Sequence, residues 1–124
     1  MRATSALVAV AVAVMAAAVP AAAQDVATGK TQFKTACAVC HSEVAGKNGV
    51  GPSLAGIVGS TSGTVPGFNF SPAMKNAKIK WDAKALDQYL TNPGKKIPQN
   101  RMPYPGQPDA AKRAAIIAYL ATLK

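Results

Sequence analysis

The segment Cys37-Ala38-Val39-Cys40-His41 decides how the rest of the chain is arranged. It contains both cysteines and the only histidine of the 124 residues. The spacing Cys-x-x-Cys-His is typical of covalent haem attachment. Two thiols three positions apart, at the end of a helix, can add to the two vinyl groups of one haem and form thioethers. The histidine is then held against one face of the iron, for which imidazole nitrogen is a good ligand.

Three other interpretations of this motif are weaker. A thioredoxin-like redox pair also uses Cys-x-x-Cys, but it needs no histidine after the second cysteine, and the surrounding βαβ pattern is absent. A structural zinc site needs four ligands, and no further cysteine or histidine completes the set. A disulfide across two intervening residues would be an isolated, strained cross-link. Haem attachment is therefore the preferred interpretation.

Residues 1–23 are typical of a secretory signal peptide. Arg2 supplies a positive charge, residues 6–19 are an uninterrupted apolar run, and Ala21-Ala22-Ala23 fits an A-x-A cleavage site. The alternative is an uncleaved membrane anchor, although the run is shorter than the roughly 20 residues of a spanning helix. We predict cleavage near Ala23, export to the bacterial periplasm and one mature domain over residues 24–124.

The mature chain is strongly basic. Without Arg2 it has 13 basic and 5 acidic residues, and the two carboxylates of a haem would remove at most two units of that excess. A basic surface favours acidic partners, such as a carboxylate-rich protein patch, an anionic membrane surface or nucleic acid. We exclude nucleic acid, because an exported chain without a basic-aromatic motif does not fit that class. The alternative is that the lysines only keep a small protein soluble.

Helices are expected at both ends of the mature chain. Residues 25–37 place Gly29, Phe33 and Cys37 on one helical face, where the glycine would let another backbone come close. Asp109 can cap a C-terminal helix. We expect this helix to pack against Gly29 and Phe33 through an apolar face at helical spacing, formed by Ile116, Tyr119, Leu120 and Leu123.

Two shorter helices are expected in the middle of the chain. Ser71-Pro72 is typical of a short helix start, and Asp82 can cap a helix that ends near Asn92. Trp81 and Tyr89 belong to the buried side of this second helix, and each has one polar atom that needs a partner when buried. Either a haem carboxylate and an axial sulfur provide those partners, or both residues are ordinary core.

The glycine-rich segment 42–67 is expected to be a long loop. Such a loop is uncommon in a compact domain unless it is functional, and covering one face of a cofactor would account for it. Pro52 follows the histidine at a distance that lets it pack on the imidazole ring. The Pro52 carbonyl, or that of a neighbour, would accept the second imidazole N–H and fix the tautomer.

The second axial ligand cannot be a histidine, because His41 is the only one. Removal of the signal peptide leaves two methionines, Met74 in a short helix and Met102 in the loop 92–108. Five prolines stiffen this loop and disfavour helix and strand, and a methionine there is poorly explained as core. We predict Met102 as the ligand. With both axial positions filled, no site is open to substrate or dioxygen, which favours an electron carrier over an enzyme.

With these features the chain resembles class I cytochrome c, near the mitochondrial cytochrome c and bacterial cytochrome c2 group. The resemblance covers nearly the whole mature chain. Its markers stand in order at Gly29, Phe33, Cys37-Ala38-Val39-Cys40-His41, Gly51-Pro52-Ser53-Leu54, Pro66-Gly67-Phe68, Trp81, Tyr89-Leu90-Thr91-Asn92-Pro93, Ile97-Pro98, Met102 and Ile116-Ile117-Ala118-Tyr119-Leu120.

The resemblance implies a mainly α, small cytochrome c fold, with helices and long loops wrapped around one covalent haem c. It implies thioethers at Cys37 and Cys40 and axial iron ligation by His41 and Met102. The other implied contacts are Trp81 at a haem propionate, Tyr89 near the methionine sulfur, Ser71 and Asn100 on the propionate side, and Tyr104 near the solvent-facing haem edge.

The chain also departs from the mitochondrial pattern. Ser60 stands where that pattern has an arginine near a propionate, and Phe70 where it has a tyrosine. Some of the lysines around the family's haem edge are replaced, for example by Ala36 and Gly94. The docking face of this chain would instead use Lys34, Lys47, Lys95, Lys96 and Arg101.

The sequence therefore predicts a monomeric, single-haem carrier of one electron at a time, in transient contact with the membrane surface. Its partners would be acidic redox proteins, such as a cytochrome bc1-type donor and an oxidase or reaction-centre acceptor. Two other classes stay open. One is a haem subunit bound tightly to a dehydrogenase or oxidase, and the other is a five-coordinate haem enzyme or sensor in which Met102 does not reach the iron.

Overall fold

The computed structural model describes residues 8–17 and 21–124. The described helices are α1 (Ala21–Ala36), α2 (Pro72–Ala77), α3 (Ala83–Thr91), α4 (Pro93–Lys96) and α5 (Ala110–Leu120). Within these ranges the only β-pairing is one isolated antiparallel bridge between Thr61 and Lys80. The prediction of a mainly α fold with long loops is confirmed.

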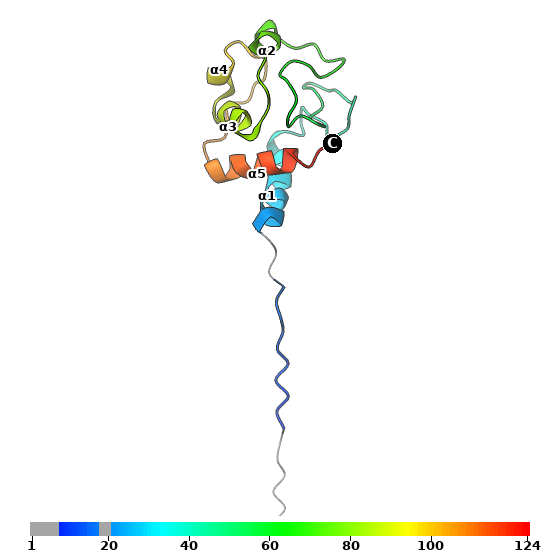
Figure 1. Ribbon diagram of the computed structural model, residues 1–124, viewed down its shortest axis with the longest axis vertical. Coiled ribbons are helices and arrows are strands. Elements are labelled where there is room, and N and C mark those ends of the chain that lie inside the picture. The colour runs from blue at the N-terminus through cyan, green and yellow to red at the C-terminus, as the bar shows by residue number, and fades with distance from the viewer. Residues whose placement is uncertain (1–7, 18–20) are drawn as a thin grey trace, which may run out of the picture.

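Residues 8–17 lie outside the folded domain as an extended segment (Figure 1). Residues 8–17 have no regular secondary structure, and residues 1–7 and 18–20 of the predicted signal peptide lie outside the described part. Helix α1 begins at Ala21 and so includes the predicted cleavage site. None of the described helices is both long and apolar enough to cross a membrane.

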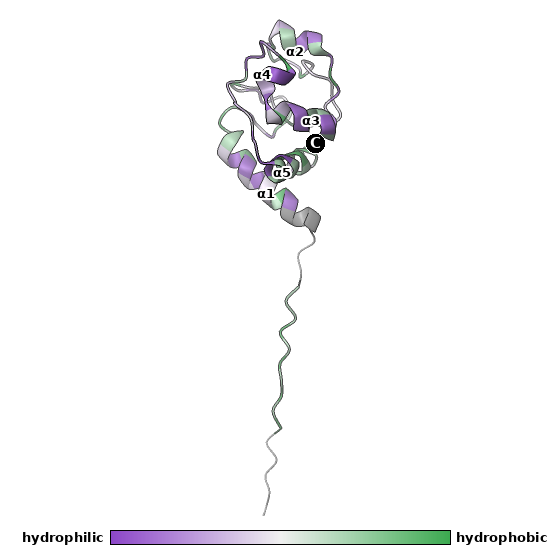
Figure 2. Ribbon diagram, turned by 90° about the vertical axis from the view of Figure 1, so that its left-hand side faces the viewer, coloured by the Kyte–Doolittle hydropathy of each residue, from purple (hydrophilic) through white to green (hydrophobic). Residues whose placement is uncertain are grey.

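Helices α1 and α5 lie side by side in both views (Figures 1 and 2). A Cβ on Gly29 would lie only 2.6 Å from the carbonyl carbon of Ala115 and 2.8 Å from Cβ of Tyr119. The ring centroids of Phe33 and Tyr119 are 5.5 Å apart, and Phe33 is 1% exposed. The predicted contact between the two helices is confirmed, and Gly29 lies directly against the backbone of α5.

The helix starts follow the predicted capping residues. Ser71 accepts a hydrogen bond from the Met74 N–H, and Asp82 accepts one from the Ala85 N–H. Asp109 accepts from the N–H groups of Ala111 and Lys112. Each cap satisfies backbone donors that the first helical turn leaves without a partner.

One helical turn was not predicted. The segment after Asn92 was expected to be loop because of its prolines, yet Pro93–Lys96 forms helix α4. Asn92 caps this turn through the Lys95 N–H, and Pro93 occupies its first position. A proline is tolerated there because its missing N–H would have no intrahelical partner. The prolines therefore exclude helix only from the later part of the loop.

Most of the core lies between these helices and the loops around them. Helix α3 contributes Ala85, Leu86, Tyr89 and Leu90 as buried residues, while α2 contributes none. Hydrophilic and hydrophobic residues alternate along α1 (Figure 2), as expected of a helix with one buried face. Arg113 of α5 joins α3 through an ion pair with Asp87 at 2.8 Å.

We predict that Gly29→Ala lowers the free energy of unfolding of the haem-loaded protein by about 1–3 kcal/mol, the usual cost of overpacking. Alanine would improve helix propensity, but the added methyl would meet the backbone of α5, which cannot move aside as a side chain can. Guanidinium unfolding measures the change. The control is Thr28→Ala on the exposed side of α1, and unchanged or increased stability of Gly29→Ala would contradict the predicted contact energy.

Candidate haem-binding site

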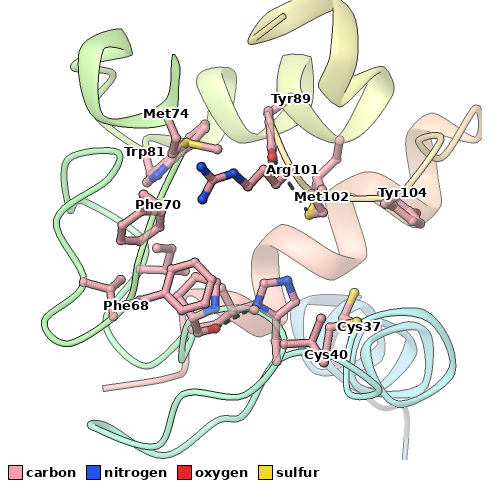
Figure 3. Close-up of a pocket in the computed structure, with 18 of the residues that line it drawn as sticks. Cys37, Cys40, Phe68, Phe70, Met74, Trp81, Tyr89, Arg101, Met102 and Tyr104 are labelled. Atoms are coloured by element: carbon pink, nitrogen blue, oxygen red, sulfur yellow. Dashed lines mark hydrogen bonds between the residues drawn. The ribbon is translucent and has the colours of Figure 1, made fainter. Parts of the chain in front are cut away.

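The domain encloses a cavity of about 510 Å³, within the range usual for small-molecule and cofactor sites. Its wall is mainly apolar and is built from the end of α1, the loop after it, α2, α3, α5 and the segment 101–104. The two cysteines lie at one side, and Met102 and Tyr89 lie across from them (Figure 3). The cavity therefore brings together residues that are far apart in the sequence.

A turn at the end of α1 brings the two thiols to the cavity wall. The Cys37 N–H donates to the Phe33 carbonyl at 2.8 Å, and the His41 N–H donates to the Cys37 carbonyl at 2.9 Å. Cys37 and Cys40 are free thiols in the structure, and both line the cavity. Burial, and to a lesser extent the neighbouring Cys40, raise the pKa of Cys37. The structure thus presents two thiols to one cavity, and burial favours the protonated form of Cys37.

His41 is fixed by a single hydrogen bond to the backbone. Its Nδ1 lies 2.7 Å from the Pro52 carbonyl oxygen, and because a carbonyl only accepts, Nδ1 must be the protonated nitrogen. Burial lowers the pKa of His41, while the bond to Pro52 acts in the opposite direction. In the neutral ring Nε2 keeps its lone pair for a metal ion. The expected contact with Pro52 is present.

Gly51 is a site residue that was recognised only as part of a family motif. A Cβ at this position would lie 2.7 Å from Nδ1 and 3.0 Å from Nε2 of His41. The absence of a side chain therefore allows the backbone to lie directly against the imidazole. Glycines are frequent in the surrounding loop, so composition alone could not single this one out.

Met102 is held in the opposite wall through Asn100. The Met102 N–H donates to Asn100 Oδ1 at 2.9 Å, and Asn100 Nδ2 donates to the carbonyls of Pro93 and Ile97 at 3.0 and 2.9 Å. Asn100 itself does not line this cavity. The structure gives it the role of holding the methionine loop, and its direct contact with a haem propionate stays a prediction.

Tyr89 lies beside the Met102 sulfur, as predicted. Its hydroxyl donates to Sδ at 3.9 Å, and its ring packs on Trp81 with centroids 5.0 Å apart. Tyr89 is only 7% exposed, and burial raises its pKa to about 12. The phenol is therefore a neutral donor at physiological pH.

Trp81 and Ser71 also line the cavity, and Trp81 lies at the side away from the cysteines (Figure 3). Ser71 is buried, and its hydroxyl oxygen accepts the Met74 N–H at 3.1 Å. The Trp81 indole N–H has no acceptor among the described residues, although the residue is 5% exposed. An indole N–H in this position is suited to a polar group on a bound ligand.

The structure shows where the two residues that depart from the mitochondrial pattern, Ser60 and Phe70, lie relative to the cavity. Ser60 lies outside the cavity wall and donates its hydroxyl to the Ile57 carbonyl at 2.7 Å. Phe70 is in the wall and meets Phe68 edge to face, with centroids 4.8 Å apart. Neither residue supplies a charge or a hydroxyl to the cavity.

Two further residues with a part in the site were not predicted as such. Met74, considered only as an alternative ligand, lines the same cavity as Met102. Asn48 ties the glycine-rich loop together, since its Oδ1 accepts the Ser53 N–H at 2.9 Å and its Nδ2 donates to the Pro66 carbonyl at 3.0 Å. Asparagine is common in loops, and nothing in the local sequence indicates a partner so distant along the chain.

The residues of the cavity fit a covalently bound haem. Two thiols, an imidazole with a free Nε2 and a thioether line one largely apolar space. At the side away from the cysteines, the Trp81 indole N–H faces the cavity. The donor set therefore matches a flat apolar group that has two thiol-reactive positions, a central metal and polar substituents at one edge.

Comparison with known proteins agrees with this geometry. A family model described as cytochrome c matches residues 26–124. The chain is 50% identical over 100 residues to "Cytochrome c2" of Rhodopila globiformis, covering 81% of this chain and 94% of that one. It is 44% identical over 100 residues to "Cytochrome c" of Euglena viridis, covering 81% and 98%. The solved structure of cytochrome cH from Methylobacterium extorquens matches with a TM-score of 0.74 at 43% identity, covering 79% and 98%.

We predict that Gly51→Ala destabilises the haem-loaded protein by about 1–3 kcal/mol, because the new methyl displaces the imidazole from the Pro52 carbonyl. Guanidinium unfolding followed at the haem absorption band measures this loss. Gly94→Ala is the matched control, since a Cβ there meets Asn92 Oδ1 only at an ordinary 3.7 Å. Equal stabilities of the two variants would show that the close approach at Gly51 has no energetic effect.

Proposed function

The chain belongs to the cytochrome c family, and on this premise we propose that it is a periplasmic carrier that accepts and donates single electrons between redox proteins. It carries covalently attached haem c, as members of this family do. The observation that carries the proposal is the presence of two uncharged ligand side chains, His41 and Met102, in the wall of one cavity. With haem bound, these two side chains would be the protein ligands of the iron and would leave no open position for a substrate.

In this proposal Cys37 and Cys40 form the two thioethers, and His41 and Met102 bind the iron. Haem c supplies a reversible one-electron couple between Fe(II) and Fe(III), and a thioether ligand raises its potential. The Pro52 carbonyl orients His41 and keeps Nε2 free of a proton. The Tyr89 hydroxyl and Asn100 hold the sulfur and the backbone of Met102.

The fold would keep the surroundings of the iron nearly unchanged between the two redox states. His41 and Met102 are attached to separate segments of a packed domain, so neither can follow a change in charge by a large movement. The apolar wall excludes most water, which otherwise would reorient when the charge changes. Fixed ligands and little solvent reorganisation suit outer-sphere electron transfer.

Electrons would enter and leave at the edge of the cavity beside the motif. Val39 and Val50 belong to the cavity wall, yet they are 80% and 76% exposed. A ligand in the cavity therefore comes close to solvent at this edge. Lys34, Lys47 and Lys95 are exposed basic residues that would steer an acidic partner, such as a cytochrome bc1-type donor and an oxidase or reaction-centre acceptor.

We predict that the ferric protein has the weak long-wavelength absorption band of a methionine sulfur bound to iron. Met102→Ala should abolish the band, because it removes the sulfur that Tyr89 holds. Met74→Ala is the matched control, since it removes the other thioether of the same cavity wall, and it should keep the band. Loss of the band in Met74→Ala alone would assign the ligand to α2, and its absence from the native protein would favour the five-coordinate enzyme or sensor.

We predict that the basic surface steers small redox reagents according to their charge. Oxidation of the reduced protein by hexacyanoferrate(III), an anion, should slow by on the order of tenfold as the salt concentration rises from about 0.01 to 1 M, because salt screens the attraction. Oxidation by the cation tris(phenanthroline)cobalt(III) should instead become faster. Stopped-flow absorbance measures both reactions, and rates without salt dependence would exclude steering by the lysines.

A further inference from the structure

Arg101 differs from the other basic residues that the structure describes in its position beside the cavity. It is the one Lys or Arg residue in the wall of the cavity. Figure 3 shows its side chain reaching across the cavity, so that the guanidinium points towards the side occupied by Phe70, Trp81 and Met74. Arg101 is exposed, as expected of a residue on the docking face with Lys34, Lys47, Lys95 and Lys96, and it also lines the cavity.

The guanidinium is poorly matched by the protein around it. Its one hydrogen bond is a long one, from Nη1 to the Asn69 carbonyl at 3.4 Å. Among the described residues, no Asp or Glu lines the cavity. The ion pair found in these residues joins Arg113 to Asp87 and does not involve Arg101. A guanidinium has five N–H donors, so most of its donors have no protein partner here.

Other donors lie at the same side of the cavity. The Trp81 indole N–H faces the cavity, and Ser71 is a buried hydroxyl in its wall. Arg101, Trp81 and Ser71 come from three separate segments, and each can donate to an anionic acceptor in the cavity. Ser60, where the mitochondrial pattern has its arginine, cannot contribute, because its hydroxyl is directed to the Ile57 carbonyl.

We propose that Arg101 is the cation that binds a carboxylate of the haem and thereby sets the charge state of that carboxylate, in place of the arginine that the chain lacks at Ser60. A guanidinium matches a carboxylate in shape and hydrogen-bond geometry. This inference rests on the proposed location of the haem in this cavity. Arg101 acts on the iron only through the carboxylate, so it is a positioning residue.

The expected effect is a shift in the titration of the carboxylate. A cation nearby favours the ionised form and so lowers the pKa of a carboxyl group, and its removal raises that pKa. Ionisation of the carboxylate adds negative charge near the iron, which stabilises Fe(III) and lowers the reduction potential. The potential should therefore fall with increasing pH over the range in which the carboxylate ionises.

Few other groups of the cavity wall titrate in the same range. Burial raises the pKa of Tyr89 to about 12, and burial followed by Cys37 raises the pKa of Tyr104. In the proposed site His41 is bound to iron and both cysteines are thioethers. A change of potential between about pH 4 and pH 8 would thus report on the haem carboxylates.

The test is the pH dependence of the reduction potential in the haem-loaded protein and its variants. Arg101→Gln should move the region in which the potential falls to higher pH, by on the order of one pH unit, and Arg101→Lys should restore most of the native profile. Lys95→Gln is the matched control, because it removes the same charge from an exposed residue of the nearby helix α4 that does not line the cavity. Its profile should keep the native pH range.

Two results would overturn the proposal. The first is an Arg101→Gln profile with the same pH range as Lys95→Gln. The second is an Arg101→Gln variant that keeps the native pH profile but changes the salt dependence of hexacyanoferrate(III) reduction more than Lys95→Gln does. That result would mean that Arg101 acts in docking and not on the haem carboxylate. Arg101→Met, which keeps the aliphatic stem, serves by the same criteria if the glutamine variant does not mature. A wrong haem location would be seen separately, because it would remove the methionine–iron absorption band from the native protein. A wrong role for Arg101 would leave that band in place.

Discussion

The contact between Gly29 and the backbone of Ala115 determines where the haem attachment motif lies. It brings α1 against α5, and the thiols follow about two helical turns later, where α1 ends and a tight turn begins. Because helix α1 is rigid over this distance, the crossing and the position of Cys37 cannot vary independently. The packing of the two terminal helices therefore also aligns the motif with the cavity.

The two proposed iron ligands are held by different physical means. His41 is close in sequence to the thioether positions, and one backbone carbonyl and a glycine fix its ring. Met102 comes from a loop far along the chain and depends on Asn100, Tyr89 and the proline-rich backbone. The histidine side is therefore specified mainly by local sequence, whereas the methionine side requires the whole domain to fold. Loosening of the domain should affect the methionine side first.

The sequence was sufficient wherever a local rule applies. The caps at Ser71, Asp82 and Asp109 and the Pro52 contact of His41 follow from short-range patterns, and the contact through Gly29 follows from the helical spacing within each of the two terminal helices. Sequence reasoning was insufficient where a side chain bonds to a residue that no pattern links to it, or where more than one backbone conformation suits the local sequence. The turn Pro93–Lys96 forms because a proline suits a first helical position, and Asn48 acts through a partner in Pro66 that no local pattern indicates. The position of Arg101 beside the cavity also needed the fold, since its local sequence does not show which distant residues it lies near.

Arg101 links two functions of the methionine loop. It directly precedes Met102 in the chain, so the segment that presents the sulfur also presents the guanidinium to the cavity. If the guanidinium binds a haem carboxylate, that ion pair resists outward movement of the loop and so helps to retain the sulfur. An arginine at position 60 could not have this effect, because it would belong to a different segment. Placing the cation beside Met102 thus couples neutralisation of the carboxylate to retention of the axial ligand.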